Sequence, residues 1–501
     1  MNPATPDFPR GAGDLSKHQT LGSAKWVAPQ NVLKALGRRD GVSPVLLGWL
    51  PDERGNTQFI SHDDDSHMVT VAGSRAGKGV SLIIPNLLSY KGSCVCVDLK
   101  GENCAVTARY RAEELGQTVV RLDPFNVVSE NTDSFNPLEM LNADSDELID
   151  DLTDLSEALI IRGAAKDAHW DDSARSVIKA VLLFILRAHE KGQRDLSLLR
   201  KYLLEGYDLD DGDGASFDSL LYAMSKMDDD YLKGMANRLN GMGTEERGSV
   251  LSTVQRNTEF LDSKPLHKVV NSSTFDISKL REGMTIYLIL PEWRLALHSR
   301  WLRLMLTIIL QKLQETPKRK SSDPSVLFIL DEFAALGHMK IIERAAGYIA
   351  GFGVKLWSVL QDLAQLKDIY DKRWETFLGN SGIMTAFGNI DLTTLDYLSK
   401  RLSKCEVMRL ETSYVEGTNY SSGGAGQQGG GGSSDSQTIN PKTVLSPLLQ
   451  PDEFSQIFSR GSGNLYIGLG GEQPVWAHRI AYYAQEPFKS RADPSPYHPS
   501  D

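Results

Sequence analysis

Cysteine is scarce in this sequence, and long apolar runs are missing from it. Four cysteines in 501 residues do not make a disulfide framework, so we expect a reducing compartment. The most apolar stretches, residues 177–186 and 302–310, each contain a lysine or arginine and are shorter than the about 20 residues that span a bilayer. The polar residues 1–10 lack the apolar segment of a signal peptide. The sequence therefore predicts no transmembrane helix.

An excess of positive charge is also absent. The chain has 54 Lys and Arg against 65 Asp and Glu, which gives a net charge of −11. It therefore carries no overall electrostatic signature of nucleic-acid binding, although a local basic channel inside an assembly stays compatible with it. The 41% hydrophobic and 24% charged content is that of a globular protein, and the length favours two or three domains.

Apolar segments that alternate with helical patterns indicate an α/β fold. The expected strands cover residues 68–72, 94–98, 118–122, 285–290, 326–330, 355–360 and 464–469. From about residue 144 to 260 the pattern is helical, with helix candidates at 145–161, 170–191, 216–227 and 231–240. Strands that alternate with helices are typical of parallel sheets. We therefore predict a parallel central sheet with an inserted all-α domain.

The same pattern divides the chain into parts. Residues 1–60 are rich in Pro, Gly and polar groups and predict an irregular arm. The α/β domain is expected over 61–140 and 270–501, and the all-α domain over 141–269. Within the α/β domain, the Gly, Ser and Gln content of residues 421–436 predicts a disordered loop at about 413–440.

A glycine-rich segment between the first expected strand and a helix has the pattern of a phosphate-binding loop. Its glycines allow backbone N–H groups to surround phosphates, and its lysine would reach the β- and γ-phosphates of ATP. Two positions depart from the usual motif: Ala72 replaces the first glycine, and Gly79 replaces the hydroxyl residue that ligates Mg²⁺. A plain strand–helix turn is the alternative. The predicted nucleotide-binding residues are Ala72, Gly73, Ser74, Arg75, Ala76, Gly77, Lys78, Gly79 and Val80.

Two adjacent carboxylates strengthen the case for nucleotide chemistry. Asp331 and Glu332 end the apolar strand predicted at 326–330. In this position Asp331 would hold Mg²⁺ through water, and Glu332 would polarise the attacking water. Gln361 follows the strand at 355–360 and would sense the γ-phosphate or hold the water, with a plain polar strand end as the alternative. We therefore predict Lys78, Glu332 and Gln361 as catalytic residues and Asp331 as the metal-binding residue.

Other polar positions carry weaker signals. Cys94 and Cys96 lie two residues apart on a strand, which favours buried side chains over a metal site. Residues 62–67 are expected to form an exposed acidic turn. Asp98 and Lys100 follow a strand end at the expected ligand-binding edge, where they serve either the nucleotide or a structural ion pair.

At these motifs the chain resembles the TraG-type coupling ATPases of conjugation and type IV secretion. The resemblance rests on residues 22–26, 74–80, 98–102, 135–138, 330–337, 349–353 and 361–366, and thus covers nearly the whole chain. In that family the phosphate-binding loop often has glycine at the position of Gly79. Family members usually carry N-terminal transmembrane helices, so this chain is expected to be either a naturally soluble member or the cytoplasmic part of an anchored one.

The resemblance implies a RecA-like nucleotide domain that binds ATP and Mg²⁺, bears the all-α domain and assembles as a homo-hexamer, with a monomer as the alternative in isolation. It also implies a cytoplasmic protein, peripheral at the inner membrane face of a bacterium. The implied partners are a relaxase–DNA complex or protein effectors, the subunits of a type IV secretion channel, and single-stranded DNA.

Three functions follow from this interpretation. The first is an ATP-driven motor that transfers DNA or effectors. The second is a recruitment adaptor that uses nucleotide only to assemble, and the third is a DNA-handling ATPase outside secretion. An arginine that acts across subunits is expected in such motors, with Arg344, Arg373 and Arg401 as candidates and a surface role for each as the alternative.

Overall fold

A computed structural model describes residues 24–36, 44–161, 168–209, 214–315, 323–419 and 432–497. Its centre is a sheet of 11 strands in the order β2-β1-β13-β12-β9-β3-β8-β7-β4-β6-β5. The strands from β9 to β5 in this order are parallel, and the other four extend the sheet in antiparallel fashion. The strands are β1 (Val45–Pro51), β2 (Thr57–His62), β3 (His67–Ala72), β4 (Cys94–Asp98), β5 (Thr118–Leu122), β6 (Met284–Ile289), β7 (Val326–Leu330), β8 (Val354–Leu360), β9 (Ser381–Phe387), β12 (Asn464–Leu469) and β13 (Val475–His478).

The central strands are apolar on both faces because helices cover both sides of the sheet. Every residue of β3, β4, β7 and β8 is buried. Side chains alternate along β4, so that Val95 and Val97 join one hydrophobic cluster while Cys94 and Cys96 join the other. The two cysteines are thus buried core residues, as the sequence indicates.

The helices of the α/β part divide between these two faces. The segment η1 (Gly79–Ile83) with α2 (Ile84–Leu87), and α3 (Glu102–Glu113), pack on the Cys94 face. The Val95 face is covered by α11 (Leu295–Glu315), α12 (Lys340–Ala345), α13 (Leu363–Tyr370), α14 (Trp374–Gly379), α15 (Leu392–Arg401) and α16 (Pro451–Ile457). The short helices α1 (Pro29–Leu36) and α17 (Phe488–Arg491) lie near the chain ends.

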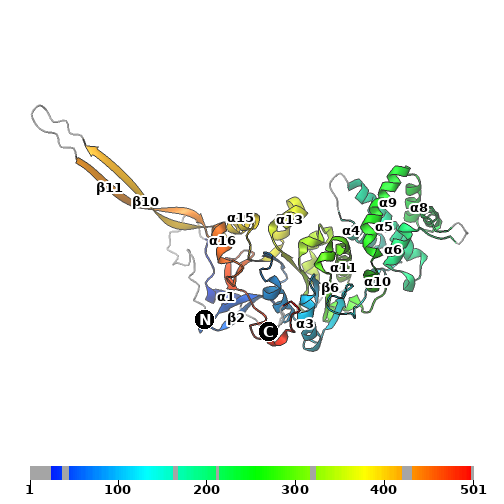
Figure 1. The fold of residues 1–501 in the computed structure, drawn as a ribbon, viewed down its shortest axis with the longest axis horizontal. Coiled ribbons are helices and arrows are strands. Elements are labelled where there is room, and N and C mark those ends of the chain that lie inside the picture. The colour runs from blue at the N-terminus through cyan, green and yellow to red at the C-terminus, as the bar shows by residue number, and fades with distance from the viewer. Residues whose placement is uncertain are drawn as a thin grey trace, which may run out of the picture.

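A helical region lies at one end of the molecule, on the right in Figure 1. It contains α4 (Leu148–Leu159), α5 (Ala168–Ala188), α6 (Leu196–Leu204), α7 (Phe217–Lys226), α8 (Asp230–Asn240), α9 (Thr244–Thr258) and α10 (Lys264–Val270). Its location between β5 and β6 agrees with the helical pattern of the sequence. The domain limits at 141 and 269 stay a prediction.

A buried arginine fastens the helical region to the sheet. Arg303 of α11 donates to the carbonyls of Ala158 (2.8 Å) and Glu157 (3.3 Å) at the end of α4. Its other hydrogen bonds go to the carbonyls of Leu336 and His338, both at 2.8 Å, which follow β7. Burial is also the main cause that lowers the pKa of Arg303 to about 10. One guanidinium therefore joins α4 to the segment that follows Glu332.

The irregular arm expected over residues 1–60 is wrong for the part that the structure describes. Residues 24–36 include α1, and residues 44–60 form most of the hairpin β1–β2 at the edge of the main sheet. Trp26 is buried against the rings of Phe458, Tyr466 and Trp476. The polar residues of the surrounding segment obscured β1, which is itself apolar and largely buried. Residues 1–23 and 37–43 lie outside the described residues.

The disordered loop expected at about 413–440 is also wrong at both of its ends. Strands β10 (Lys404–Asn419) and β11 (Gly432–Pro447) pair in antiparallel register as a hairpin that projects from the body (Figure 1). Gly and Ser lack the side chains that build a core, but backbone pairing does not need them. Residues 420–431 lie outside the described residues.

The seven strands expected from the sequence are all present. Four further strands of the main sheet, β1, β2, β9 and β13, were not expected from the sequence, and of these β9 pairs with β3 at the centre of the sheet. Across the described ranges, no helix combines the length and the hydropathy that crossing a membrane requires.

Candidate nucleotide site

The segment after β3 folds as a tight loop at the carboxyl end of the sheet. Gly77 has φ of +92° and Arg75 has φ of +55°, both in the left-handed region. Glycine adopts this region without strain, which explains why Gly77 is needed there. Gly73 donates to the carbonyl of Phe387 (3.3 Å), and a Cβ at Gly73 would lie 2.1 Å from the carbonyl oxygen of Gly388. The loop is therefore seated closely against the end of β9.

The helix after this loop begins as a π-helix and becomes α-helical at Ile84. Pro85 has no N–H and its ring disfavours the preceding turn, which accounts for the wider winding before it. The carbonyl of Leu82 is satisfied by the side-chain amide of Asn86 at 2.9 Å. The N-terminal N–H groups of the segment follow Lys78 directly and face the end of the sheet that ligands use.

The predicted catalytic residues come together around Lys78. Its Nζ atom lies 3.1 Å from Oδ1 of Asp331 and also contacts Oε1 of Glu332. Gln361, which follows β8, donates from Nε2 to Oε2 of Glu332 at 3.0 Å. Glu332 itself has φ of +52°, a left-handed conformation that is uncommon for a non-glycine residue. The strand order places β3, β7 and β8 side by side, which brings these four side chains together.

Burial shapes the charges of this cluster. Burial raises the pKa of Asp331, because the opposing charge of Lys78 does not fully offset the loss of water. For Lys78, burial acts to lower the pKa, but the carboxylates of Asp331 and Glu332 outweigh it and the pKa is raised. The ammonium of Lys78 is therefore kept charged between two acidic groups.

A cavity of about 340 Å³ lies over these residues. Of the predicted site residues, those that line it are Ser74, Arg75, Gly77, Lys78, Gly79, Asp331, Glu332 and Gln361. The loop residues Ala72 and Ala76 are buried behind it, Gly73 contacts β9, and Val80 packs against a small apolar cluster. All the predicted residues thus belong to one loop and two neighbouring strand ends.

Further residues line the same cavity. Asp98 and Lys100 do so, and Asp98 uses its carboxylate to accept main-chain N–H groups of Cys104 (2.8 Å) and Lys100 (3.4 Å). Burial raises the pKa of Asp98 to about 7. Sequence reasoning missed Glu102, Asn103 and Glu292. Glu292 follows β6, so the rule that ligands bind at the carboxyl ends of parallel strands was the signal that could have found it.

Magnesium fits this lining by charge and by ligand type. The cavity presents five acidic side chains, from Asp98, Glu102, Glu292, Asp331 and Glu332, against the cationic side chains of Arg75, Lys78 and Lys100. Carboxylate oxygen and water are the ligands that Mg²⁺ prefers. The half-buried carboxylate of Asp331 lies at the end of β7, beside the glycine-rich loop, where the sequence predicts the metal-binding residue. Gly79 offers no hydroxyl, so such an ion would depend on Asp331 and water.

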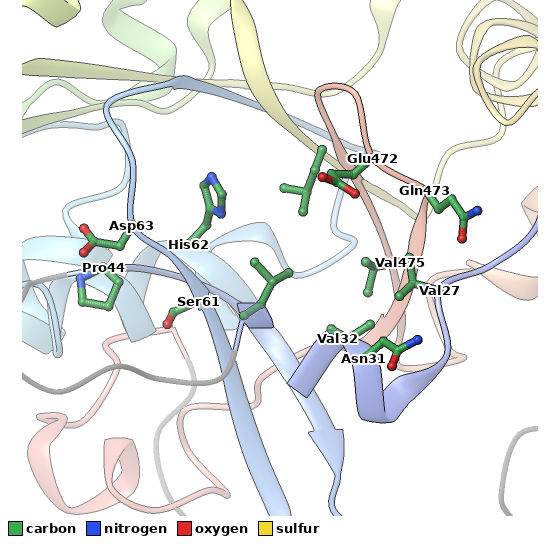
Figure 2. Close-up of a pocket in the computed structure, with 12 residues that line it drawn as sticks. Val27, Asn31, Val32, Pro44, Ser61, His62, Asp63, Glu472, Gln473 and Val475 are labelled. Atoms are coloured by element: carbon green, nitrogen blue, oxygen red, sulfur yellow. The ribbon is translucent and has the colours of Figure 1, made fainter. Parts of the chain in front are cut away.

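A second cavity, of about 330 Å³, lies at the opposite end of β3, near His62, which precedes that strand. Figure 2 shows Val27, Val32 and Val475 across from His62 and Asp63. Its lining lacks the glycine-rich loop and the lysine that mark the cavity over Lys78. His62 lies 2.8 Å from Asp64, which lies 3.4 Å from the buried Lys355. The aspartates at 63–65 of this turn are exposed, as the sequence predicts, whereas His67 at its end is buried.

The three arginines considered for an intersubunit role have partners within the chain. Arg344 lies 3.0 Å from Asp154, and Arg373 contacts Glu343. Arg401 donates to the hydroxyl of Tyr397 at 3.5 Å. These contacts fit surface roles, and an arginine that acts across subunits stays unassigned among the described residues.

Comparison with known proteins gives consistent matches over most of the chain. A family model described as Type IV secretory system Conjugative DNA transfer matches residues 14–499. The conjugal transfer protein TraG of Escherichia coli is 25% identical, and the match covers 94% of this chain and 78% of TraG. The protein VirD4 of Agrobacterium fabrum is 26% identical, and the match covers 93% of this chain and 66% of VirD4.

Solved structures share the fold. The bacterial conjugative coupling protein TrwBdeltaN70 in its unbound monoclinic form has a TM-score of 0.66 at 15% identity, with 94% of this chain and 96% of that chain covered. TrwB in complex with the non-hydrolysable ATP analogue ADPNP has a TM-score of 0.65 at 15% identity and the same coverage. TrwB in complex with ADP and Mg²⁺ has a TM-score of 0.63 at 14% identity, with 91% and 94% covered. At these identities the likeness establishes the fold alone.

Proposed function

The chain belongs to the type IV secretory conjugative DNA transfer family, and on this premise we propose that it is an ATP-hydrolysing coupling protein. It recruits DNA–protein or effector substrates to a type IV secretion channel and drives their transfer. The observation that carries this proposal is the cluster of Lys78, Asp331, Glu332 and Gln361 at the end of β3, β7 and β8. A lysine beside two carboxylates and an amide is the set that phosphoryl transfer to water requires.

Each residue of the cluster has a distinct role in this proposal. Lys78 and the N–H groups of residues 73–80 bind the phosphates of ATP. Asp331 would hold Mg²⁺, and Mg²⁺ bound there would neutralise charge on the phosphate oxygens. Glu332 accepts a proton from the attacking water, while Gln361 fixes the orientation of the Glu332 carboxylate through the 3.0 Å hydrogen bond.

The contact between Lys78 and Glu332 has a consequence for timing. While Lys78 contacts Glu332, the carboxylate is engaged by an ammonium and is a poor proton acceptor. When the Lys78 ammonium instead contacts a phosphate of bound ATP, the Glu332 carboxylate is free to accept a proton from water. The base is therefore freed only in the nucleotide-bound site, which limits futile activation of water.

The relatives supply the setting of the proposal. The matching proteins are named for conjugal transfer and for coupling, and TrwB has been solved with ADPNP and with ADP and Mg²⁺. By analogy we place this chain at the inner membrane face, in a homo-hexamer that contacts channel subunits and either a relaxase–DNA complex or protein effectors. In that ring, single-stranded DNA is a further ligand.

Transfer in cells tests the motor function directly. Glu332→Gln keeps the shape and the nucleotide contacts of the site but removes the base, so we expect a large loss of plasmid or effector transfer with the protein still present. Glu375→Gln, at an exposed position on α14, is the matched control and should transfer normally. Normal transfer by Glu332→Gln would contradict the motor and favour a recruitment adaptor.

A further inference from the structure

Arg479 reaches the phosphate-binding loop from the far end of the chain. It follows β13, and its Nη1 atom donates to the carbonyl oxygen of Ala76 at 2.6 Å. Its Nη2 atom donates to the carbonyl oxygen of Arg460, also at 2.6 Å. One guanidinium therefore connects the loop between β3 and η1 with the segment before β12.

Arg479 is itself held firmly on several sides. Its backbone N–H donates to the carbonyl of Gly463 at 2.8 Å, and its own carbonyl accepts from Nε1 of Trp49 at 3.0 Å. Its guanidinium lies 4.8 Å from the centroid of the Phe387 ring, a cation–π distance. Since Phe387 also accepts from Gly73, the same end of β9 supports both the loop and the arginine.

The contact with Ala76 fixes the direction of one peptide group. A trans peptide is planar, and its C=O and N–H point in opposite directions. When Arg479 holds the Ala76 oxygen, the N–H of Gly77 is directed away from Arg479. Gly77 lines the nucleotide cavity, while Ala76 is buried behind it. The peptide between Ala76 and Gly77 thus presents its N–H on the side of the cavity.

We propose that Arg479 is a positioning residue for nucleotide binding, which holds the Ala76 carbonyl outward so that the Gly77 N–H is ready for a phosphate oxygen. Glycine at 77 makes this necessary, because a residue that tolerates both signs of φ lets the peptide turn over easily. A turned peptide would aim a carbonyl oxygen at the phosphates and repel them. This inference rests on the proposed nucleotide site. It adds that Arg479 keeps the loop in the conformation in which the Gly77 N–H can bind an anion.

Calorimetric titration of the full chain with MgATP and MgADP tests this role. For Arg479→Ala we expect Kd to rise about tenfold or more for both nucleotides, the effect of losing a charge-assisted hydrogen bond. KM for ATP should rise in parallel, while kcat at saturating ATP stays within about threefold of wild type, since the bound state restores the loop. Arg479→Lys retains one donor without the planar fork and should give an intermediate Kd.

Controls separate this role from a structural one. Arg109→Ala removes an ion pair with Asp493, 2.7 Å away, and should leave Kd unchanged. An unchanged Kd in Arg479→Ala, or in Arg479→Lys if the alanine variant does not fold, overturns the positioning role. If the wild-type protein binds ATP in that case, the proposed function is kept and only the role of Arg479 is lost. If wild type binds no nucleotide, both proposals fail.

Discussion

The ammonium of Lys78 lies 3.1 Å from the carboxylate of Asp331, although β7 follows the loop by more than two hundred residues. The parallel pairing of β3 with β8 and of β8 with β7 produces this contact. The glycine-rich loop and the acidic strand end therefore form one charged unit before any ligand is considered. Changing either partner should alter nucleotide binding and stability together.

Removing the Lys78 ammonium should abolish nucleotide binding. In Lys78→Ala the phosphates lose their main cationic partner, and Asp331 and Glu332 face each other without a counter-charge. We expect Kd for MgATP to rise at least about 100-fold, since charged hydrogen bonds in a site of this kind contribute about 3 kcal/mol. Calorimetry measures it, and Lys367→Ala, at an exposed position of α13, is the control. Unchanged binding in Lys78→Ala would exclude this loop as the site.

Gln361 should affect turnover more than binding. Its amide donates to Glu332 at 3.0 Å, so Gln361→Ala leaves the carboxylate free to rotate. We expect kcat for ATP to fall by about 10- to 100-fold with KM changed less than about threefold, the sign of an interaction used in the transition state. Steady-state kinetics give both values. A rise in KM at constant kcat would show instead that Gln361 holds the nucleotide.

Asp98 should make stability depend on pH. Burial raises its pKa from 3.8 to about 7, so the folded protein holds this proton more tightly than the unfolded chain does. Its contribution to stability is therefore complete below about pH 4 and is lost as the pH rises through about 7. The advantage of wild type over Asp98→Asn in free energy of unfolding should shrink between about pH 5 and pH 8, as denaturant titrations would measure.

Asp276 gives the matched control for this pH effect. The hydroxyl of Ser278 and its backbone N–H lower the pKa of Asp276, so its contribution is lost only at acid pH below that window. The stability difference between wild type and Asp276→Asn should stay level from about pH 5 to pH 8. A level difference for Asp98→Asn as well would contradict the protonated, buried state of Asp98.

Arg303 should contribute strongly to stability. Arg303→Met keeps the apolar bulk but leaves the carbonyls of Ala158, Leu336 and His338 without their donor in a buried place. We expect a loss of about 3 kcal/mol or more in the free energy of unfolding. Arg109→Ala breaks a half-exposed ion pair and should cost much less. A similarly small loss in the free energy of unfolding for both variants would contradict the claim that Arg303 holds α4 to the segment after Glu332.

The site could be predicted from the sequence because its parts are contiguous motifs. Residues 72–80 and 331–332 each follow an apolar strand, and parallel strands bring their carboxyl ends to one edge. Gln361 follows the next strand in the same way. The RecA-like fold was predicted only from the resemblance to a family. The same resemblance explained why a nucleotide-binding loop can have glycine at position 79.

Other parts of the molecule left no local signal. Arg479 is 403 positions from Ala76, and only the edge strands β12 and β13 bring them together. The hairpin β10–β11 has a polar composition, and it is held by cross-strand backbone pairing, which does not need apolar side chains. At its base, Cys405 and Val407 pack against the hydrophobic core. Patterns of polarity therefore predicted disorder where pairing decides the structure.

Hydrolysis and binding of ATP by Glu332→Gln test the central claim most directly. The purified full chain and this variant are compared by phosphate release and by calorimetry with MgATP, in the presence and absence of single-stranded DNA. The account predicts that wild type releases phosphate, and that the variant binds ATP within about threefold of the wild-type affinity but turns over at least about 100-fold more slowly, as loss of a general base requires. Phosphate release by the variant at the wild-type rate would contradict the assignment of Glu332 as the catalytic base.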